Sequence, residues 1–575
     1  MPSSPRTAGI LIPVSAIRSS IDLGVGDTRG VREMIDWCAQ HGLGVLQILP
    51  INETSDDNSP YNAISSLALE PTTIATDPDA LPDLDPADFD SIATPARIDP
   101  LRAGPVQYAA VRALKSDLLS AAFRRFEQVH AGRGTPHDLD FRSFRDEHAA
   151  WLGDYALFRA LMEHNGGWPT WECWPTEQQD PTSARAGLQT LPSGHRESIE
   201  ERIRFFGYVQ WIAFRQWEEV RRHGTRRGVT VMGDIPFGVG RSSADVWATR
   251  DIFNLDWSGG CPPERIFKVD PFTEKWGQNW GIPLYRWGLL RSRGFDWWRT
   301  RVGNLRRIFH AFRIDHVLGF FRIYAFPWTP DRNDHFLPLT EAEAAAETGG
   351  HLPHFSRCDD ETPEHRAENQ TQGEELLRMI LDAAGDTAVV AEDLGVVPPY
   401  VPPTLAALGI PGFAIPFLMR NAGEPYPAPE TFPELAVTAP ATHDHPPLRG
   451  AWEEGWRTLD IHGPESAAGR AAQAELRAIH AFATGIDAPV PPRAFTEAVH
   501  EGFLAALMRS PARRVICLFA DILGTADRYN TPGSVGDPNW TPRLERPVPE
   551  LDADPAFAAH VSRYTTLARK HGRCG

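Results

Sequence analysis

The sequence predicts an α/β fold, a (β/α)8 TIM barrel, from three observations. Eight short runs rich in Val, Ile, Leu and Ala recur along the chain, helical patterns lie between many of them, and acidic residues follow several runs directly. Short apolar runs bounded by turn residues are typical of strands buried on both faces of a parallel sheet. Such strands form either a closed barrel or a doubly wound open sheet, and the number eight favours the barrel.

The predicted elements alternate from one end of the chain to the other. Helical segments show apolar residues at a spacing of about 3.6 residues, most clearly over 199–223. The expected strands are 9–14, 44–50, 229–235, 311–315, 387–392, 411–418, 436–443 and 514–521. The expected helices are 30–41, 199–223, 373–384 and 494–509.

Three stretches between strands are too long to be simple loops, so we expect subdomains over one end of a single barrel domain that spans 1–575. Residues 52–195 are expected to form a mostly helical insertion, 236–300 an insertion with a substrate loop, and 325–370 a third. The Asp/Pro-rich passage 77–100 is interpreted as a solvated surface excursion.

Composition limits the class of partner. The 575 residues are 42% hydrophobic, enough for a large core, and the formal charge of -18 has no Lys/Arg block to offset it. Nucleic acids and anionic membranes need clustered positive charge, so neither is expected as a partner. A neutral or cationic small molecule is expected instead.

Neither export nor a metal site is expected. The N-terminal apolar run from Ala8 to Val14 is short and contains Pro13, which is too weak for a signal peptide, and no apolar stretch of 18 residues exists. A cytoplasmic location is the expectation. The six cysteines are far apart and without a C-x-x-C pair, which predicts free thiols and no metal.

Acidic residues stand where five of the predicted strands end, and barrel enzymes place catalytic groups at the carboxyl ends of their strands. For any one acid, a helix cap or a turn residue is an equally good interpretation. Five together favour a site. They are Asp234, Asp315, Glu392, Asp444 and Asp521.

Two of these acids are suited to the two carboxyl roles of glycoside chemistry, the nucleophile and the general acid. In AFRID, alternation puts Arg313 and Asp315 on the same, inward face, where the guanidinium would keep the carboxylate ionised as a nucleophile. Glu392 ends the apolar run TAVVAE, where burial would let it hold a proton as a general acid. A lone Arg-x-Asp is more often a structural ion pair, but a charged and a protonated carboxyl in one pocket fit a retaining mechanism.

Other segments are suited to a sugar. The segment from Lys275 to Trp287, KWGQNWGIPLYRW, combines aromatic platforms with the amides of Gln278 and Asn279, although a Trp-anchored loop core is the competing interpretation. Tyr61 is a further candidate platform, and His443 with Asp444 is a further candidate for binding hydroxyls. No Gly-x-Ser-x-Gly elbow, Walker loop or dinucleotide fingerprint accompanies these groups.

The sequence resembles the 4-α-glucanotransferase (amylomaltase, disproportionating enzyme) family, the glycoside hydrolase family 77 type, nearly from end to end. The motifs that carry the resemblance are GILIPVSAI with LGVGD, LQILPIN, NSPYNAISS, GDIPFGV with SSADVW, GQNWGIPLY, FRIDH, VVAEDLG, THD, and NTPGSV followed by NW and RL. Carried over position by position, it makes Asp315 the nucleophile, Glu392 the acid/base and Asp444 the transition-state stabiliser. Donor-site and substrate-loop positions of the family are matched by Tyr61, Asp234, Gln278, Trp280, Arg313, His443 and Asn530.

The resemblance implies a barrel with inserted subdomains, no metal, no cofactor and no C-terminal β-sandwich. It implies transfer of α-1,4-glucan segments from a maltooligosaccharide to the 4-hydroxyl of glucose or a glucan by a retaining double displacement. A hydrolase with the same fold and acids, and an inactive glycan-binding protein, stay open as alternatives. Oligomeric state, acceptor preference and the purpose of 325–370 are not predicted.

A few residues depart from the family pattern without touching the three acids. Asn58 and Asn62 flank the SPY motif where Asp and Gln are usual, Ala520 replaces Gln, and Pro447 replaces Thr after THD. The long gap between Asp315 and Glu392 makes the shape of the acceptor site uncertain.

Overall fold

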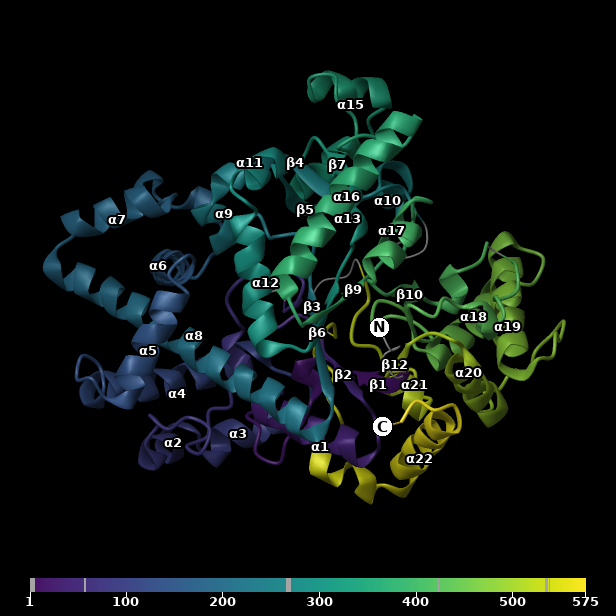
Figure 1. Ribbon diagram of the computed structural model, residues 1–575, viewed down its shortest axis with the longest axis horizontal. Helices are drawn as coiled ribbons and strands as arrows, with labels where there is room; N and C mark the ends of the chain where they lie inside the picture. Colours follow the sequence, from purple (N-terminus) through teal and green to yellow (C-terminus); the bar gives the residue numbers. More distant parts are fainter. Residues whose placement is uncertain are drawn as a thin grey trace.

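At the centre of the computed structural model is a ring of eight parallel strands, as the sequence predicts (Figure 1). The structure describes residues 6–55, 58–264, 270–421, 423–532, 536 and 538–574. The strands are β1 (Thr7–Leu11), β2 (Val45–Gln47), β3 (Thr230–Ile235), β6 (Ala311–Ile314), β9 (Ala388–Ala391), β10 (Gly412–Ala414), β11 (Ala436–Thr438) and β12 (Arg514–Leu518). Neighbours follow the order β10-β11-β12-β1-β2-β3-β6-β9, and the Ala391 amide donates to the Pro411 carbonyl at 2.8 Å to join the last strand to the first. The (β/α)8 barrel is therefore confirmed.

Alternation along β6 sorts its side chains between two apolar layers. Ala311 packs inside the barrel with Met232 and Val390, whereas Phe312 and Ile314 belong to the larger core between strands and helices. Arg313 and Asp315 follow Ala311 on the inward face. The strands are shorter than the apolar runs that predicted them, because residues after a strand, such as the fully buried Ile415, are also part of the core.

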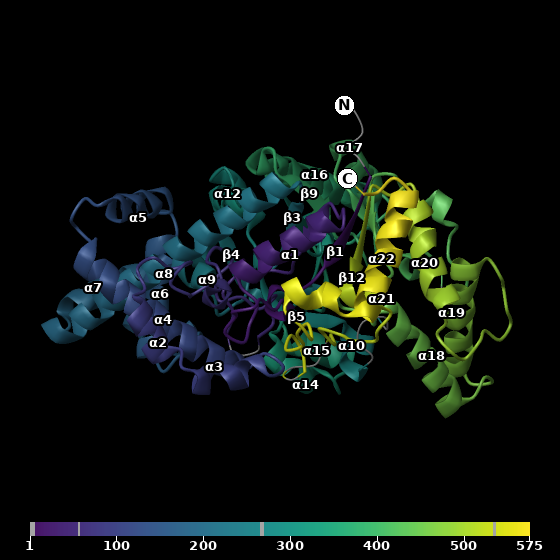
Figure 2. The ribbon, with the colours of Figure 1, turned by 90° about the horizontal axis from the view of Figure 1, so that it is seen from below.

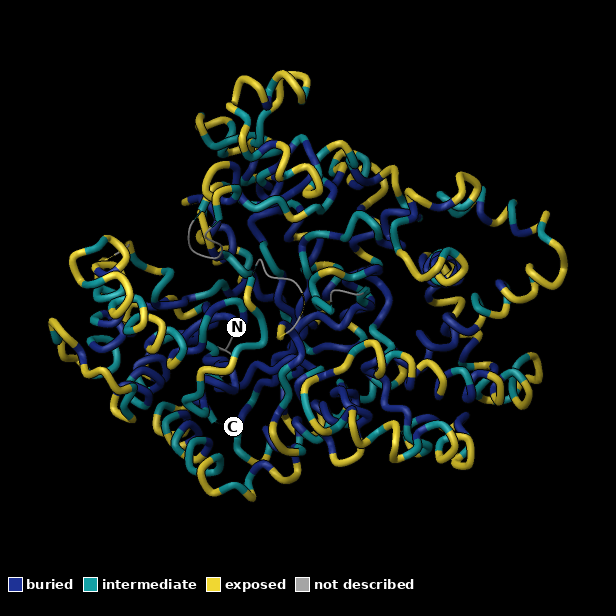
Figure 3. Tube along the Cα trace, turned by 180° about the vertical axis from the view of Figure 1, so that it is seen from behind, coloured by how far each residue is buried: buried dark blue, intermediate teal, exposed yellow. Residues whose placement is uncertain are grey.

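Helices cover the outside of the ring, and Figure 3 shows the buried centre beneath them. The predicted helices 199–223 and 373–384 fall within longer real ones, whereas the structure has helices at Thr28–Gln40 and Glu497–Arg509 where 30–41 and 494–509 are predicted. The helix α16 begins at Pro363 because Thr362 accepts a hydrogen bond from the His365 amide and proline suits the first helical position. The covering helices include α1 (Thr28–Gln40), α8 (Ser193–Arg227), α12 (Asp296–Ile308), α16 (Pro363–Ala384), α17 (Val401–Leu408), α20 (Glu497–Arg509), α21 (Phe519–Leu523) and α22 (Pro555–Lys570).

Between β2 and β3 the chain forms a helical region, at the left of Figure 1. Its helices before α8 are α2 (Pro86–Ile92), α3 (Pro95–Arg102), α4 (Tyr108–Val129), α5 (Pro136–Glu147), α6 (Leu152–His164) and α7 (Pro181–Thr190). The interpretation of 77–100 as a solvated excursion is wrong. Asp85 caps α2 with Pro86 at its first position, and Leu81 and Leu84 are buried, so Asp-Pro here marks a helix start.

A second, antiparallel sheet lies beside the barrel. Its order is β5-β4-β7-β8, so residues from 236–300 and 325–370, expected as separate insertions, share one sheet. Its strands are β4 (Phe253–Cys261), β5 (Gln278–Tyr285), β7 (Ile323–Phe326) and β8 (His354–Ser356), and nearby helices are α9 (Ala244–Ala248), α10 (Pro271–Trp276), α11 (Trp287–Ser292), α13 (Leu318–Phe321), α14 (Asn333–Phe336) and α15 (Glu341–Glu347). In Figure 2, β5, α10, α14 and α15 lie along one side of the molecule, at the bottom of the view.

Two further helices, α18 (Leu448–His462) and α19 (Ala467–Thr484), follow β11 and pack with α20 at the right of Figure 1. The sequence analysis had not predicted them. Among the described residues, no helix is both long and apolar enough to cross a membrane. All six cysteines are free thiols.

Candidate active site

The carboxyl ends of the barrel strands open into a cavity of about 530 Å³. Segments far apart in the chain contribute its walls, which include both acids and aromatic rings. Lining residues that the sequence had singled out are Tyr61, Trp280, Asp315, Asp444 and Asn530, and others are Phe237, His316 and Trp540. The cavity therefore brings carboxylates and aromatic platforms together at the end of the barrel where enzymes of this fold act.

Arg313 links two of the acids beneath the cavity. Its Nη1 donates to Asp234 Oδ2 at 2.6 Å, and its Nη2 lies 2.8 Å from Asp315 Oδ1. The Tyr61 hydroxyl donates to the same Asp234 oxygen at 2.7 Å. Burial raises the pKa of Asp234, and the Arg313 guanidinium opposes that rise. Asp315, by contrast, keeps 29% of its side chain exposed, so it is fixed by Arg313 and still accessible from the cavity.

Glu392 directly follows β9, the strand next to β6, and lies in a more buried environment than Asp315. The His316 amide donates to its Oε2 at 2.7 Å. Burial raises the pKa of Glu392 to about 8, an effect that Arg313 reduces and the Asp315 charge increases. At neutral pH this carboxyl holds a proton. His316 itself has φ of +48°, a conformation that costs a non-glycine residue energy and that clusters at functional sites.

Asp444 faces the cavity from the loop after β11. Asn530 donates through its amide to Asp444 Oδ1 at 2.8 Å, and His443 Nε2 lies 3.4 Å from Oδ2. Burial acts to raise the pKa of Asp444, but His443, Arg313 and the Asn530 hydrogen bond together lower it. Tyr61 stacks on the His443 ring with 5.4 Å between centroids and 3° between planes.

Gln278 and Trp280, expected in a loop, lie at the start of strand β5, which pairs with β4, and Trp280 lines the cavity. Trp280 is 38% exposed and meets the His316 ring edge-on at 4.7 Å. The Gln278 amide donates to Glu264 at 2.5 Å and accepts from the Trp280 indole at 3.2 Å. Gln278 is thus engaged with a neighbouring acid that the sequence analysis did not single out, whereas Trp280 faces the cavity directly.

Comparisons with known proteins identify the family of the chain. A family model described as 4-alpha-glucanotransferase matches residues 12–548. The chain belongs to this family. A 4-alpha-glucanotransferase of Chlamydia caviae is 29% identical over 563 residues, covering 96% of this chain and 93% of the relative. One from Thermus thermophilus is 29% identical over 552 residues, covering 94% and 95%.

Solved structures confirm the fold. An amylomaltase from Streptococcus agalactiae, in complex with acarbose, aligns with a TM-score of 0.73 at 22% identity, covering 99% of this chain and all of that one. An amylomaltase from Corynebacterium glutamicum gives a TM-score of 0.75 at 22% identity over 98% of this chain and 75% of its own. The resemblance stated from the motifs is therefore confirmed, although Gly533, Ser534 and Val535 of NTPGSV lie outside the described residues.

Asp521, the fifth acid at a strand end, does not join the others. Its Oδ1 accepts from the Leu448 amide at 2.8 Å, where α18 begins, and it does not line the cavity. Burial raises the pKa of Asp521 to about 7. The ordinary interpretation of a strand-end acid, a cap for a helix, is correct for this one.

Three contributors to the cavity were given no role from the sequence. Phe237 and His316 were quoted only within GDIPFGV and FRIDH. Trp540, which lies 6.2 Å from both Tyr61 and His443 by ring centroids, is the Trp of a motif noted only as NW. The signal for His316 was its position directly after Asp315. No pattern around Trp540 indicates that it returns to the cavity, because that depends on the path of the chain after β12.

Proposed function

We propose that the protein is a 4-α-glucanotransferase, which moves a segment of α-1,4-glucan from a donor maltodextrin to the 4-hydroxyl of glucose or another glucan. The observation that carries the proposal is a carboxyl paired with an arginine next to a buried carboxyl whose pKa is raised. Asp315 is paired with Arg313 at 2.8 Å, and Glu392 has a pKa of about 8. Retaining glycoside chemistry needs one carboxylate and one carboxylic acid. The names of the relatives support the same activity.

In the first step of the proposed reaction, Asp315 attacks C1 of the donor while Glu392 gives its proton to the departing glycosidic oxygen. The bond from Asp315 oxygen to C1 forms as the C1–O4 bond breaks, and the shortened glucan leaves with a free 4-hydroxyl. Arg313 holds Asp315 in place through its Nη2. Glu392 is now ionised beside a carboxylate that has lost its charge.

In the second step, Glu392 acts as the base. It takes the proton from the 4-hydroxyl of an incoming sugar, whose oxygen attacks C1 and releases Asp315. The substrate classes that we propose are α-1,4-glucans, maltooligosaccharides and glucose, and no step uses a metal or a cofactor. Transfer requires that an acceptor sugar reaches the intermediate faster than water does.

Other residues are proposed to bind and orient the sugar. Asp444, whose pKa is lowered, would bind ring hydroxyls more strongly as positive charge develops at C1. Buried His443, whose Nε2 lies 3.4 Å from Asp444 Oδ2, would orient that carboxylate toward the sugar. Tyr61, Trp280 and Asn530 would complete the donor site.

The remaining site residues would act around this set. Asp234 and Arg313 would hold the floor of the site, and Gln278 would position Trp280.

Two further predictions concern the whole chain. Residues 1–575 form one catalytic barrel domain whose insertions are 52–195, 236–300 and 325–370. The protein works in the cytoplasm, which fractionation of expressing cells would check.

The products from maltotriose distinguish transfer from hydrolysis. With maltotriose alone, we expect glucose and longer oligosaccharides at nearly constant total reducing ends, measured by chromatography and a reducing-end assay. A steady rise in reducing ends would show a hydrolase. Binding of maltotriose without turnover would show a glycan-binding protein.

A further inference from the structure

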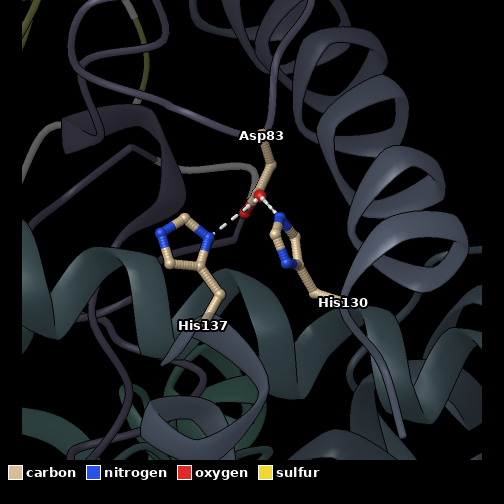
Figure 4. A group of neighbouring side chains, drawn as sticks. All are labelled: Asp83, His130 and His137. Carbon is tan, nitrogen blue, oxygen red and sulfur yellow. Dashed lines mark hydrogen bonds and ion pairs between the residues drawn. The ribbon is translucent and has the colours of Figure 1, made fainter. Parts of the chain in front are cut away.

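A cluster of metal-ligating side chains lies in the helical region between β2 and β3, away from the cavity described above (Figure 4). It consists of Asp83, His130 and His137, whose ligand atoms all lie within 4.8 Å of one another. Asp83 precedes α2, His130 follows α4, and His137 is in the first turn of α5. Figure 4 shows both imidazoles directed at the one carboxylate.

The two distances from the histidine nitrogens to Asp83 suit a cation with tetrahedral coordination. His137 Nδ1 and His130 Nε2 lie 3.2 Å and 3.5 Å from the same atom, Asp83 Oδ1. Zn²⁺ binds nitrogen and oxygen ligands at about 2.0–2.2 Å, which places two ligands of a tetrahedron about 3.3–3.5 Å apart. Both measured distances are close to that edge. The 3.2 Å contact is also a hydrogen bond, whereas the 3.5 Å contact is longer than an N–H···O hydrogen bond.

Further contacts orient these ligands. The buried Tyr208 hydroxyl donates to Asp83 Oδ2 at 2.9 Å, which leaves Oδ1 facing the imidazoles. His130 Nδ1 lies 3.0 Å from the Thr135 hydroxyl, so the other ring nitrogen, Nε2, is the one aimed at Asp83. Metal-bound histidines and carboxylates in proteins are held by outer hydrogen bonds of this kind.

The cluster also has room for a further ligand. Asp83 and His137 line a hollow of about 770 Å³ with Trp211 and Arg215. The exposed fraction of Asp83 is 2%, whereas the His137 side chain is 39% exposed. A cation held here would contact the buried Asp83 carboxylate on one side and water in the hollow on the other.

We propose that Asp83, His130 and His137 form a binding site for a divalent transition-metal cation of the Zn²⁺ class, completed by water from the hollow. Two imidazoles with one carboxylate favour Zn²⁺ or Co²⁺ over Mg²⁺ or Ca²⁺, which prefer oxygen ligands. The bound cation joins the segment before α2 to the α4–α5 connection, so its role is structural.

The test uses the full chain, stripped of metal, with ZnCl₂ as the probe. Titration calorimetry is expected to give one Zn²⁺ per chain, and Zn²⁺ is expected to raise the melting temperature. The double variant H130Q/H137Q should bind at least about 100-fold more weakly, because second-shell changes alone cost 10–100-fold. The matched control H164Q/H195Q removes two exposed imidazoles from the same region and should bind as the wild type does.

Equal Zn²⁺ affinity in the two double variants, or no binding by the wild type, would overturn the proposal. Circular dichroism checks that both variants fold. If H130Q/H137Q does not fold, the visible spectrum of wild-type protein with CoCl₂ decides. An intense tetrahedral Co²⁺ band supports the site, and the weak spectrum of hydrated, octahedral Co²⁺ contradicts it.

Discussion

For single residues, the proposed chemistry needs one ionised and one protonated carboxyl group in the same site. Arg313 contacts Asp315 directly, and the buried environment of Glu392 raises its pKa to about 8. The His316 amide then holds the Glu392 side chain toward Asp315. An acid that protonates a leaving oxygen near neutral pH must keep its own proton there.

The pKa of Glu392 predicts the pH dependence of transfer. Because the first step needs protonated Glu392, kcat/KM for maltotriose should fall as pH rises through about 8, the pKa of the free enzyme. An unshifted glutamate would place this fall near 4.5. Initial rates from pH 6 to 9.5 measure it, and a flat profile over that range would contradict the assignment of Glu392 as the acid.

Alternation and strand ends were sufficient to predict which acidic side chains lie together at one end of the barrel. AFRID predicted that Arg313 and Asp315 share a face, and their 2.8 Å contact follows from it. The same reasoning grouped Asp521 with them, because a strand end looks alike in sequence whether its acid faces a cavity or caps a helix. The contact between Gln278 and Glu264 depends on a hairpin register that composition does not show.

At the scale of elements, the hairpin that carries Trp280 depends on one glycine. Gly277 has φ of +103°, and a Cβ there would lie 2.2 Å from the Cys261 carbonyl oxygen on β4. Only glycine combines that conformation with that close approach. The turn between α10 and β5 therefore sets where Gln278 and Trp280 lie.

Gly277→Ala should displace the substrate loop. We expect about 1–3 kcal/mol less unfolding free energy and a KM for maltotriose raised several-fold, because Trp280 moves relative to the cavity. The control is Gly288→Ala in α11, where a Cβ meets no atom within 4 Å. That variant should be neutral or slightly more stable. Denaturant unfolding and initial rates measure both, and equal behaviour of the two variants would contradict this role for Gly277.

Elements with strong local signals were predictable, and those made by distant pairing were not. Each barrel strand is a buried apolar run, so all eight were located. The second sheet joins β4 to β7, which are separated by the barrel strand β6, and no local pattern indicates that pairing. Composition does not distinguish α2 and α3 from a loop, because Asp and Pro occur both in turns and at helix starts.

At the scale of the whole molecule, several buried acids hold protons that the unfolded chain would release. Burial raises the pKa of Glu33, Asp393 and Asp521 to about 7 and that of Glu392 to about 8. The stability that these protons give is complete below the ordinary carboxyl pKa and is lost as pH rises through the folded values. Histidines with lowered pKa, such as His148 and His310, act in the opposite direction only below about pH 6.5.

The melting temperature should therefore fall as pH rises from 6.5 to 8. Asp521→Asn keeps the shape of the neutral acid but removes one of these four titrating groups. The melting temperature of this variant should therefore fall less steeply over the same pH range. Calorimetric scans at several pH values measure both slopes. A melting temperature that rises with pH in this window would contradict the proposed protonation of the buried acids.

The proposed reaction requires a covalent bond between the donor sugar and Asp315. Trapping this glycosyl-enzyme shows whether the bond forms. In Glu392→Gln, α-maltosyl fluoride can still glycosylate the nucleophile, because fluoride leaves without a proton, but the base for the second step is missing. Peptide mass spectrometry should then find a maltosyl group on Asp315, and none when Asp315→Asn is added. A maltosyl group on Asp444 or Asp234, or release of maltose with no adduct at any time, would contradict the account.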